Sequence, residues 1–351
     1  MSDTLQPACP LPLDQYERIL MAHGGGGQLM HQLLERKVQP LFNNPALAAR
    51  HDSAELLCGD QRLAFTTDSY VIKPLFFPGG DIGKLAVCGT LNDLAMAGAR
   101  PLALSAALII EEGLPVADLE RVLASMAATA RAAGVPIVTG DTKVVERGQA
   151  DGLYVNTAGI GRIDAACAPI RPASVRPGDA VLVSGDLGRH GIAIMAHREG
   201  LALETQIESD CADLSGLVAR LLEAGVELHC LRDLTRGGLA SAVIEIAEGA
   251  GVGITLEESA IPVREDVLGA CEMLGFDPLQ VANEGRLVAF LPDAQADQAL
   301  ALMRAHPLGG AAALIGRVTP ATPPVSVRVR TAFGTERMLL RLSGEQLPRI
   351  C

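Results

Sequence analysis

The apolar run from Leu102 to Ile110 constrains the fold most, because it is far too short to cross a membrane and too apolar to lie in water. It predicts a buried strand. The segment 116–134 carries apolar residues at helical spacing and predicts an amphipathic helix, and 136–145 predicts the next strand. With 351 residues, of which 49% are hydrophobic, the chain is long enough for about two domains.

Other segments show the same two patterns on either side of a Pro-rich stretch, Pro169–Pro177, which predicts a domain boundary. Before it, 62–72 and 154–163 predict strands, and helices are expected after the glycine run Gly24–Gly27 and at 82–98. The last two strands expected after the boundary form a hairpin around a glycine turn. The second unit is predicted to hold helices near 191–200, 211–224, 236–250 and 293–305, and strands at 252–256, 286–292, 325–330 and 336–342.

The chain is acidic: 41 Asp and Glu stand against 29 Lys and Arg, for a formal net charge of −12. Such a chain is a poor candidate for binding nucleic acid or anionic membranes, since phosphate binding depends on clustered Lys and Arg. The first residues, MSDTLQPACP, lack the basic start and apolar stretch of a secretory signal. We therefore expect a cytoplasmic protein that binds neither nucleic acid nor membrane.

Eight cysteines are spread along the chain, and no two lie within four residues of each other. This spacing excludes the paired ligands of a structural zinc site and argues against a disulfide framework. Most are expected to be buried free thiols. Cys351 is expected to differ, because it is the last residue and has little around it to be buried in. The nine residues 343–351 contain no predicted element and could extend about 30 Å, so we expect a flexible tether that ends in a thiol.

Four consecutive glycines, Gly24, Gly25, Gly26 and Gly27, precede a predicted helix. Their N–H groups, together with the helix dipole, could hold an anion. A flexible turn is the alternative, and the run alone does not decide between them. Neither standard nucleotide signature is present, since GGDIGKL lacks the spacing and the Ser/Thr of a phosphate loop and no G-x-G-x-x-G follows a strand.

Acidic side chains stand where predicted strands of the first domain end. Asp68 closes one strand, Asp141 follows another, Asp52 lies just upstream, and Asn92 with Asp93 lies in the helix 82–98. Separated carboxylates that converge from strand ends, with phosphate as a further ligand, are how proteins hold Mg²⁺. Each residue alone is more often a helix cap or turn residue. Together with the glycine run, they favour a site for Mg-ATP.

Two charged residues each have a structural and a functional interpretation. Lys143 lies among apolar residues at the end of a predicted strand, as an ion-pair partner or as a charge on a transferring phosphoryl group. Glu284 lies in a turn before a strand, where an exposed acid is usually only solvated.

The segment RDLTRGGLA in the second domain predicts a loop, two glycines and a helix start. There Thr235 or Asp233 could cap the helix while Arg232 and Arg236 face a substrate anion. The seven histidines show no ligand spacing, so no histidine metal site is expected.

From about residue 20 to Cys351 the chain resembles the HypE family, the carbamoyl dehydratases of hydrogenase maturation. The resemblance rests on AHGGGG, FTTDSYVIKPLFFPGGDIGKLAVCGTLNDLAMAGARP, VTGDTKVVERG, RDLTRGGLA, ANEGRLV and LPRIC. This family belongs to the PurM-like superfamily of aminoimidazole-ribotide synthetase. The resemblance implies an α/β first domain whose sheet joins that of a second subunit in a barrel-like homodimer, an α/β second domain, and ATP under the glycine run. The implied divisions are 1–44 (lead-in with the ATP loop), 45–168 (ATP-binding domain), 169–342 (second domain) and 343–351 (flexible tail with the reactive cysteine).

The resemblance also implies a reaction and its partners. A carbamoyltransferase, HypF, loads a carbamoyl group on the terminal cysteine, ATP-dependent dehydration makes a thiocyanate, and the cyano group passes to iron on the HypC–HypD scaffold. Phosphorylating the amide oxygen makes phosphate the leaving group, which requires Mg²⁺ and a cation, and removing the nitrogen protons requires a base.

The resemblance implies catalytic roles for Cys351, Lys143 and Glu284, with Glu284 as the base. It places nucleotide contacts on the four glycines, Asp68, Asn92 and Asp141, and Mg²⁺ contacts on Asp52, Asp68, Asp93 and Asp141. One departure is Arg189, which stands where family members often have an acid, so no role is carried to it.

Two other classes stay open. A small-molecule kinase or synthetase of the same superfamily, like selenophosphate synthetase or thiamine-phosphate kinase, would share the nucleotide cleft but has no use for a terminal cysteine. A non-catalytic scaffold of the hydrogenase machinery would not need the acids and Lys143.

Overall fold

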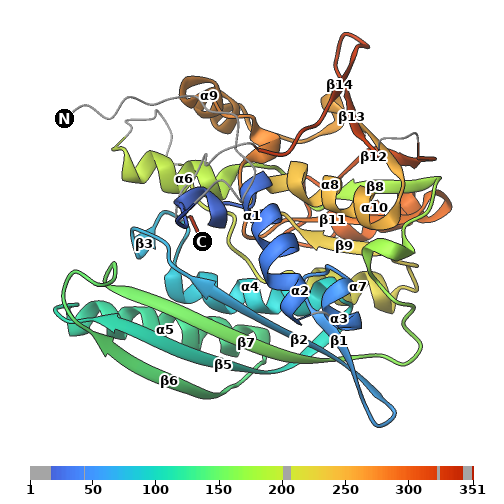
Figure 1. The fold of residues 1–351 in the computed structure, drawn as a ribbon. Coiled ribbons are helices and arrows are strands. Elements are labelled where there is room, and N and C mark those ends of the chain that lie inside the picture. The colour runs from blue at the N-terminus through green and yellow to red at the C-terminus, as the bar shows by residue number, and fades with distance from the viewer. Residues whose placement is uncertain (1–16, 43, 201–206, 322–324, 343–349) are drawn as a thin grey trace.

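The computed structural model describes residues 17–42, 44–200, 207–321, 325–342 and 350–351. Two domains are each built around one large sheet with helices packed on it (Figure 1). No helix in these described ranges is both long and apolar enough to cross a bilayer. The mixed α/β fold with two domains confirms the expected fold class.

The first domain holds a five-stranded sheet in the order β1-β2-β7-β5-β6. Its neighbouring strands are antiparallel except for β5 and β6, which are parallel. The elements of this domain are β1 (Ala54–Cys58), β2 (Gln61–Tyr70), β3 (Phe76–Phe77), β4 (Gly80–Asp81), α4 (Ile82–Met96), β5 (Ala99–Glu111), α5 (Val116–Ala133), β6 (Ile137–Val145) and β7 (Leu153–Ile163).

Helices α4 and α5 cover one face of this sheet, and the contact with α4 is very close. In β7, Leu153 and Val155 are fully buried beneath the helices. At Gly159 a Cβ would lie 2.8 Å from Cγ2 of Thr90 and 2.9 Å from Cδ1 of Leu94, so any larger residue would push α4 away. Strand β7 therefore requires glycine at position 159, where α4, the helix that carries Asp93, packs against it.

The opposite face of the sheet is open within one chain. Phe65 and Ile160 are direct cross-strand neighbours and are 45% and 36% exposed. Ile109, which is 41% exposed, pairs with Lys143 on β6. The sheet is not closed into a barrel within the single chain, and its exposed apolar side chains are of the kind that usually mark an interface.

The second domain holds a seven-stranded sheet in the order β14-β13-β10-β12-β8-β11-β9. Every residue of the interior strand β8 is buried, because Val181 and Val183 pack toward α8 while Ala180 and Leu182 pack toward α7 and α10. Its elements are β8 (Asp179–Val183), α6 (Arg189–Arg198), α7 (Ser215–Glu223), β9 (Cys230–Asp233), α8 (Gly238–Ala250), β10 (Gly253–Glu257), α9 (Glu265–Leu274), β11 (Leu287–Pro292), α10 (Ala296–Arg304), β12 (Ala313–Thr319), β13 (Val327–Arg330) and β14 (Glu336–Met338).

Most predicted elements are present, and the hairpin of β13 and β14 is confirmed with Gly334 at φ +81°. The helix expected over 211–224 begins only at Ser215, because the preceding residues form a loop between the domains. Among the elements that were not predicted are β1, β3, β4, β8, β9, β12 and α9. Strand β9 is only four residues long and runs into the segment read as a loop, and β12 is interrupted by an irregularity between Leu314 and Gly316.

Short helical segments between residues 21 and 48 lie across the junction of the two domains (Figure 1). The N–H of Gln28 donates to the carbonyl of Leu342 at 2.9 Å, which ties the start of α1 to the end of the second domain. These segments are the 3-10 helix η2 (Met21–Gly24), α1 (Gln28–Leu33), the π-helical turn η3 (Leu34–Val38), α2 (Gln39–Phe42) and α3 (Pro45–Ala48).

Candidate active site

A polar cavity of about 280 Å³ lies where the first domain, the second domain and the N-terminal helices meet. Figure 1 shows the C-terminal end of the chain at this junction, beside α1. The lining side chains come from all three parts of the molecule: Met30, His31, Leu34, Asp52, Thr67, Asp68, Asp93, Arg232, Asp233, Thr235, Arg236, Glu245, Glu284 and Cys351, with Gly26, Gly27 and Gly89.

Three carboxylates form a tight cluster in this cavity. Asp52 precedes β1, Asp93 lies on α4 and Asp233 ends β9, and one oxygen of each lies within 4.8 Å of the others. Burial, opposed by Arg232 beside it, raises the pKa of Asp52 to about 6. Burial and the neighbouring acids raise the pKa of Asp93 and of Asp233 well above the ordinary value. Three like charges at this distance need protons or a cation between them, and oxygen ligands suit a hard divalent cation.

The cluster is oriented by fixed partners on its outer side. The Nε of Arg232 lies 3.0 Å from Oδ1 of Asp52, and its Nη1 lies 2.9 Å from Glu245. The hydroxyl of Thr66 donates to Oδ2 of Asp93 at 2.7 Å. The second oxygen of Asp52 is buried and has no hydrogen-bond partner in the described structure, so it is free to ligate a cation.

On the other side of the cavity, a thiol, a guanidinium and a carboxyl group converge. The Nη1 of Arg236 lies 3.3 Å from Sγ of Cys351. Glu284 is 3% exposed, and its Oε1 has no hydrogen-bond partner among the described residues. Burial and nearby acids raise the pKa of Glu284 well above its ordinary value, which suits a group that accepts a proton during a reaction.

The terminal cysteine is not where the sequence placed it. Cys351 is 8% exposed and Ile350 is 4% exposed, so the prediction that Cys351 has little to be buried in is wrong. Burial raises the pKa of the Cys351 thiol to about 11 against the opposing effect of Arg236. The expected tether at 343–349 lies outside the described residues.

The turn that carries Glu284 is held by Asp210, whose carboxylate accepts the N–H groups of Glu284 and Gly285 at 3.3 and 3.1 Å.

Arg189, the departure from the family pattern, lies outside the cavity lining. It pairs with Asp186 at 2.7 Å, and Arg286 pairs with the same carboxylate at 2.6 Å. The substitution is therefore accommodated by an acid that binds two arginines.

The glycine run is only partly in the site. Gly26 and Gly27 line the cavity, whereas Gly24 ends a 3-10 helix and Gly25 caps it. Gly26 has φ +76°, and a Cβ there would lie 2.8 Å from Cβ of Arg236. Only glycine combines this positive φ with room for Arg236, so Gly26 allows both a turn and the close approach of Arg236.

Five of the residues to which the sequence analysis gave a role line the cavity: Asp52, Asp68, Asp93, Glu284 and Cys351. Asn92 does not: its Nδ2 donates to the carbonyl of Ala212 and its Oδ1 accepts the N–H of Leu214, which joins the two domains. Neighbouring helix positions point about 100° apart, so Asn92 and Asp93 cannot both face the cavity.

Asp141 and Lys143 lie on the exposed strand β6, outside the cavity of their own chain. The Nζ of Lys143 is 2.7 Å from Oδ2 of Asp141, and their side chains are 67% and 63% exposed. Both pair in register with β5 on the open face of the sheet. Their predicted roles in catalysis and in nucleotide and metal binding stay predictions.

Two other cavities help to define the site. One, of about 460 Å³, adjoins the acid cluster and shares His31, Asp52 and Arg232 with it. Its other lining residues include the apolar Val38, Ala46, Leu47 and Phe65 together with charged side chains such as Glu35 and Arg50.

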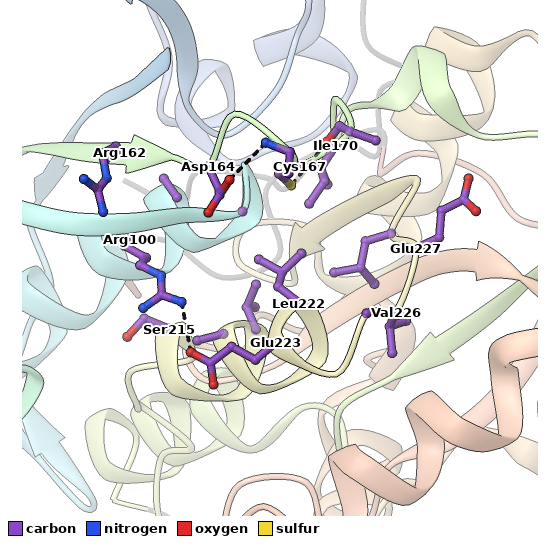
Figure 2. A pocket seen from close by; sticks show the side chains of 18 of the residues that line it. Arg100, Arg162, Asp164, Cys167, Ile170, Ser215, Leu222, Glu223, Val226 and Glu227 are labelled. Atoms are coloured by element: carbon purple, nitrogen blue, oxygen red, sulfur yellow. Dashed lines mark hydrogen bonds and ion pairs between the residues drawn. The ribbon is translucent and has the colours of Figure 1, made fainter. Parts of the chain in front are cut away.

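The other cavity, of about 560 Å³, lies apart between α7 and the residues around Arg100 (Figure 2). There Arg100 and Glu223 neutralise each other at 3.0 Å. None of its described lining residues has a buried polar atom without a partner, so it offers no comparable chemistry.

Sequence reasoning treated Asp233 as a cap and did not see it as part of the acid cluster. The missed signal is that Asp233 ends a strand, which is the position that drew attention to Asp68. Arg232 and Arg236, which were expected to face a substrate anion, both line the cavity, where Arg232 pairs with Asp52 and Arg236 lies beside the thiol.

Both domains are those of the AIR synthase-related proteins. The family model for the N-terminal domain of AIR synthase-related proteins matches residues 50–163, and that for the C-terminal domain matches residues 176–327. Thiamine monophosphate kinase from Aquifex aeolicus, at 17% identity and a TM-score of 0.63, shares the fold alone.

More similar relatives define the family within that class. Carbamoyl dehydratase HypE of Rhodobacter capsulatus is 55% identical over 95% of this chain and 98% of its own length. A solved structure of HypE in complex with ATP aligns with a TM-score of 0.80 at 47% identity, covering 94% of this chain and 98% of its own. HypE in a HypE–HypF complex aligns with a TM-score of 0.84 at 46% identity, covering 88% and 99%. The chain belongs to the HypE carbamoyl dehydratase family.

Proposed function

We propose that this protein is an ATP-dependent carbamoyl dehydratase that converts a carbamoyl group on Cys351 into a thiocyanate, for the cyanide ligands of the Fe(CN)₂CO centre of [NiFe]-hydrogenase. The observation that carries the proposal is that Sγ of Cys351 lies in the same cavity as the carboxylate cluster and Glu284. A small-molecule kinase has no reason to bury its own terminal thiol there.

The reaction balances in two steps. The carboxamide oxygen attacks the γ-phosphorus of ATP, ADP leaves, and one proton leaves the nitrogen. The carbon–oxygen bond to phosphate then breaks while a base takes the second nitrogen proton, which leaves S–C≡N and inorganic phosphate. Glu284 is the base in this account, because it is buried, unpartnered and of raised pKa.

The cavity residues divide between the nucleotide and a cation. Asp52, Asp93 and Asp233 fit Mg²⁺, whose positive charge would offset the negative charge of the phosphates. The adjoining cavity of about 460 Å³, whose lining mixes apolar side chains such as Val38, Leu47 and Phe65 with polar ones, suits the adenosine part of ATP, with the phosphates directed to the acid cluster. The structure of a related HypE in complex with ATP supports ATP as the nucleotide.

The partners follow from the chemistry of the tail. A HypF-type carbamoyltransferase must load the thiol, and the HypE–HypF complex of a relative supports that pairing. The HypC–HypD scaffold is the expected acceptor of the cyano group. Since both must reach Cys351, the buried tail end must leave the cavity at these stages.

A homodimer would cover the open face of the first-domain sheet. Phe65, Ile109 and Ile160 on that face are apolar and exposed, and Lys143 lies among them on β6. Two such faces packed together would bury the apolar side chains. Because Lys143 lies outside the cavity of its own chain, we infer that it serves the site of the partner subunit.

Intact-mass analysis after incubation with carbamoyl phosphate, a HypF-type transferase and Mg-ATP tests the proposal. We expect a species heavier by one carbamoyl group and, after ATP, lighter by one water, both on the peptide that ends at Cys351. Glu284→Gln should load normally and dehydrate 10²- to 10⁴-fold more slowly, whereas the exposed Glu272→Gln should match the parent. A modified small molecule with an unmodified protein would instead indicate a kinase of the same fold.

A further inference from the structure

The last two residues are held in the cavity like a bound peptide. The side chain of Ile350 packs in the first-domain core cluster with Ile194, Cys211 and Ala282 from the second half of the chain. The main-chain oxygen of Cys351 accepts the N–H of Val71 at 3.0 Å. These contacts set the direction in which the chain end enters the site.

His190 makes the remaining main-chain contact. Its Nε2 lies 2.5 Å from the carbonyl oxygen of Ile350, and its ring meets Phe77 edge-on with centroids 5.5 Å apart. His190 is fully buried, yet it is absent from the lining of the 280 Å³ and 460 Å³ cavities. It therefore touches the tail without touching the space assigned to ATP.

The partners of His190 determine which nitrogen carries the proton. A carbonyl oxygen only accepts, so Nε2 must donate to Ile350. Nδ1 lies 2.8 Å from the hydroxyl of Ser209, and that hydroxyl accepts the N–H of Cys211 at 3.0 Å. The Ser209 hydroxyl thus donates to Nδ1, and each polar group in the chain of contacts is satisfied with a neutral imidazole.

We propose that His190, oriented by Ser209, is a positioning residue that holds the Ile350 carbonyl and so directs the Cys351 sulfur toward Arg236 and Glu284. Ile350 is the specificity-determining side chain of the tail, because it occupies the only apolar anchor that the described tail residues provide. The inference rests on the proposed function for its catalytic consequence, but the docking itself can be measured without any turnover.

The first test is the rate at which N-ethylmaleimide alkylates Cys351, measured by peptide mass spectrometry and divided by the rate in denaturant. The exposed Cys58 serves as an internal control in the same sample. His190→Leu keeps the ring's bulk but loses the donor, and we expect alkylation of Cys351 to rise about tenfold with no change at Cys58. His190→Gln keeps an N–H near the position of Nε2 and should stay within about twofold of the parent. An unchanged Cys351 rate in His190→Leu would overturn the proposal.

A second pair of variants keeps the test valid if His190→Leu does not fold. Ile350→Ala should raise alkylation of Cys351 at least as much, whereas Leu340→Ala, at an exposed position nearby in the chain, should not. Equal effects of these two variants would contradict a specific anchor for Ile350.

The catalytic consequence separates positioning from a general structural role. In the loaded protein, His190→Leu should slow dehydration at saturating ATP about tenfold while the KM for ATP stays unchanged, and His190→Gln should restore the rate. Faster alkylation with an unchanged dehydration rate would overturn the positioning role. Protection of Cys351 that depends on His190, in a parent protein that never dehydrates its tail, would support the docking and count against the proposed function.

Discussion

Arg236 connects the glycine run to the terminal thiol. Its Nη1 lies 3.3 Å from Sγ of Cys351, and its Cβ lies 2.8 Å from where a side chain on Gly26 would begin. The guanidinium can therefore keep its place beside the sulfur only while residue 26 has no side chain.

Gly26→Ala should displace Arg236 and disturb the site. The alanine would be strained at φ +76° and would clash with Arg236, so we expect a loss of about 1–2 kcal/mol in stability and at least a tenfold slower dehydration. Gly24→Ala is the matched control, because no atom lies within 4 Å of its added Cβ. Thermal unfolding and intact mass measure the two effects, and equal behaviour of the two variants would contradict the close-approach role.

Asp93→Asn should stabilise the metal-free protein while it removes the response to Mg²⁺. Burial and the neighbouring acids disfavour the charged form of Asp93 and raise its pKa, so the neutral amide should raise the Tm of the metal-free protein. Mg²⁺ should raise the Tm of the parent but not of the variant. Asp60→Asn, at an exposed turn, should change neither, and a variant that still gains stability from Mg²⁺ would show that the acid cluster is not the cation site.

The stabilisation by Mg²⁺ should grow as the pH rises. The pKa of Asp52 is about 6 in the folded chain against 3.8 as its ordinary value, so the folded state binds more protons between these values. The metal-free protein therefore loses stability from this group as pH rises through that window. A cation replaces those protons, so the Tm shift from Mg²⁺ should be small near about pH 5 and largest near about pH 8. A pH-independent shift would place the cation elsewhere.

Mixed dimers test whether Lys143 acts on the partner subunit. Lys143→Ala and Cys351→Ala should each be inactive in dehydration when alone. When the two are combined, a mixed dimer holds one site with both residues intact if Lys143 acts across the interface, so about half of the sites in each mixed dimer should regain activity. No recovery in verified mixed dimers would mean that Lys143 acts within its own chain, and activity of Lys143→Ala alone would mean that it has no role.

The sequence predicted the acids of the site better than their partners. Asp93 could be recognised because it lies on a helix beside other candidate acids, but its neighbour Asn92 was included although it faces the second domain. Which face of a helix points into the cavity depends on tertiary packing, here the packing of α4 against Gly159. The local sequence does not reveal that packing. Asp233 was missed because β9 is too short to show a strand pattern.

The burial of the tail was the largest error. Residues 350–351 form no helix or strand, and their burial depends on contacts with Val71, His190 and Arg236, which are 115 or more positions away in the chain. A single apolar residue followed by cysteine looks the same whether it is solvated or docked. The fold class, by contrast, could be predicted from hydrophobic patterns within single segments. The strands and the helix predicted in this way are present as β5, α5 and β7.

The most direct test of the central claim follows the oxygen of the carboxamide. Protein loaded on Cys351 with a carbamoyl group that carries a heavy isotope of oxygen is given Mg-ATP in ordinary water, and the released phosphate is analysed by mass spectrometry. If the carboxamide oxygen attacks the γ-phosphorus, one labelled oxygen appears in inorganic phosphate for each thiocyanate formed. Unlabelled phosphate alongside thiocyanate formation would show that ATP does not activate the amide oxygen, and would contradict this account.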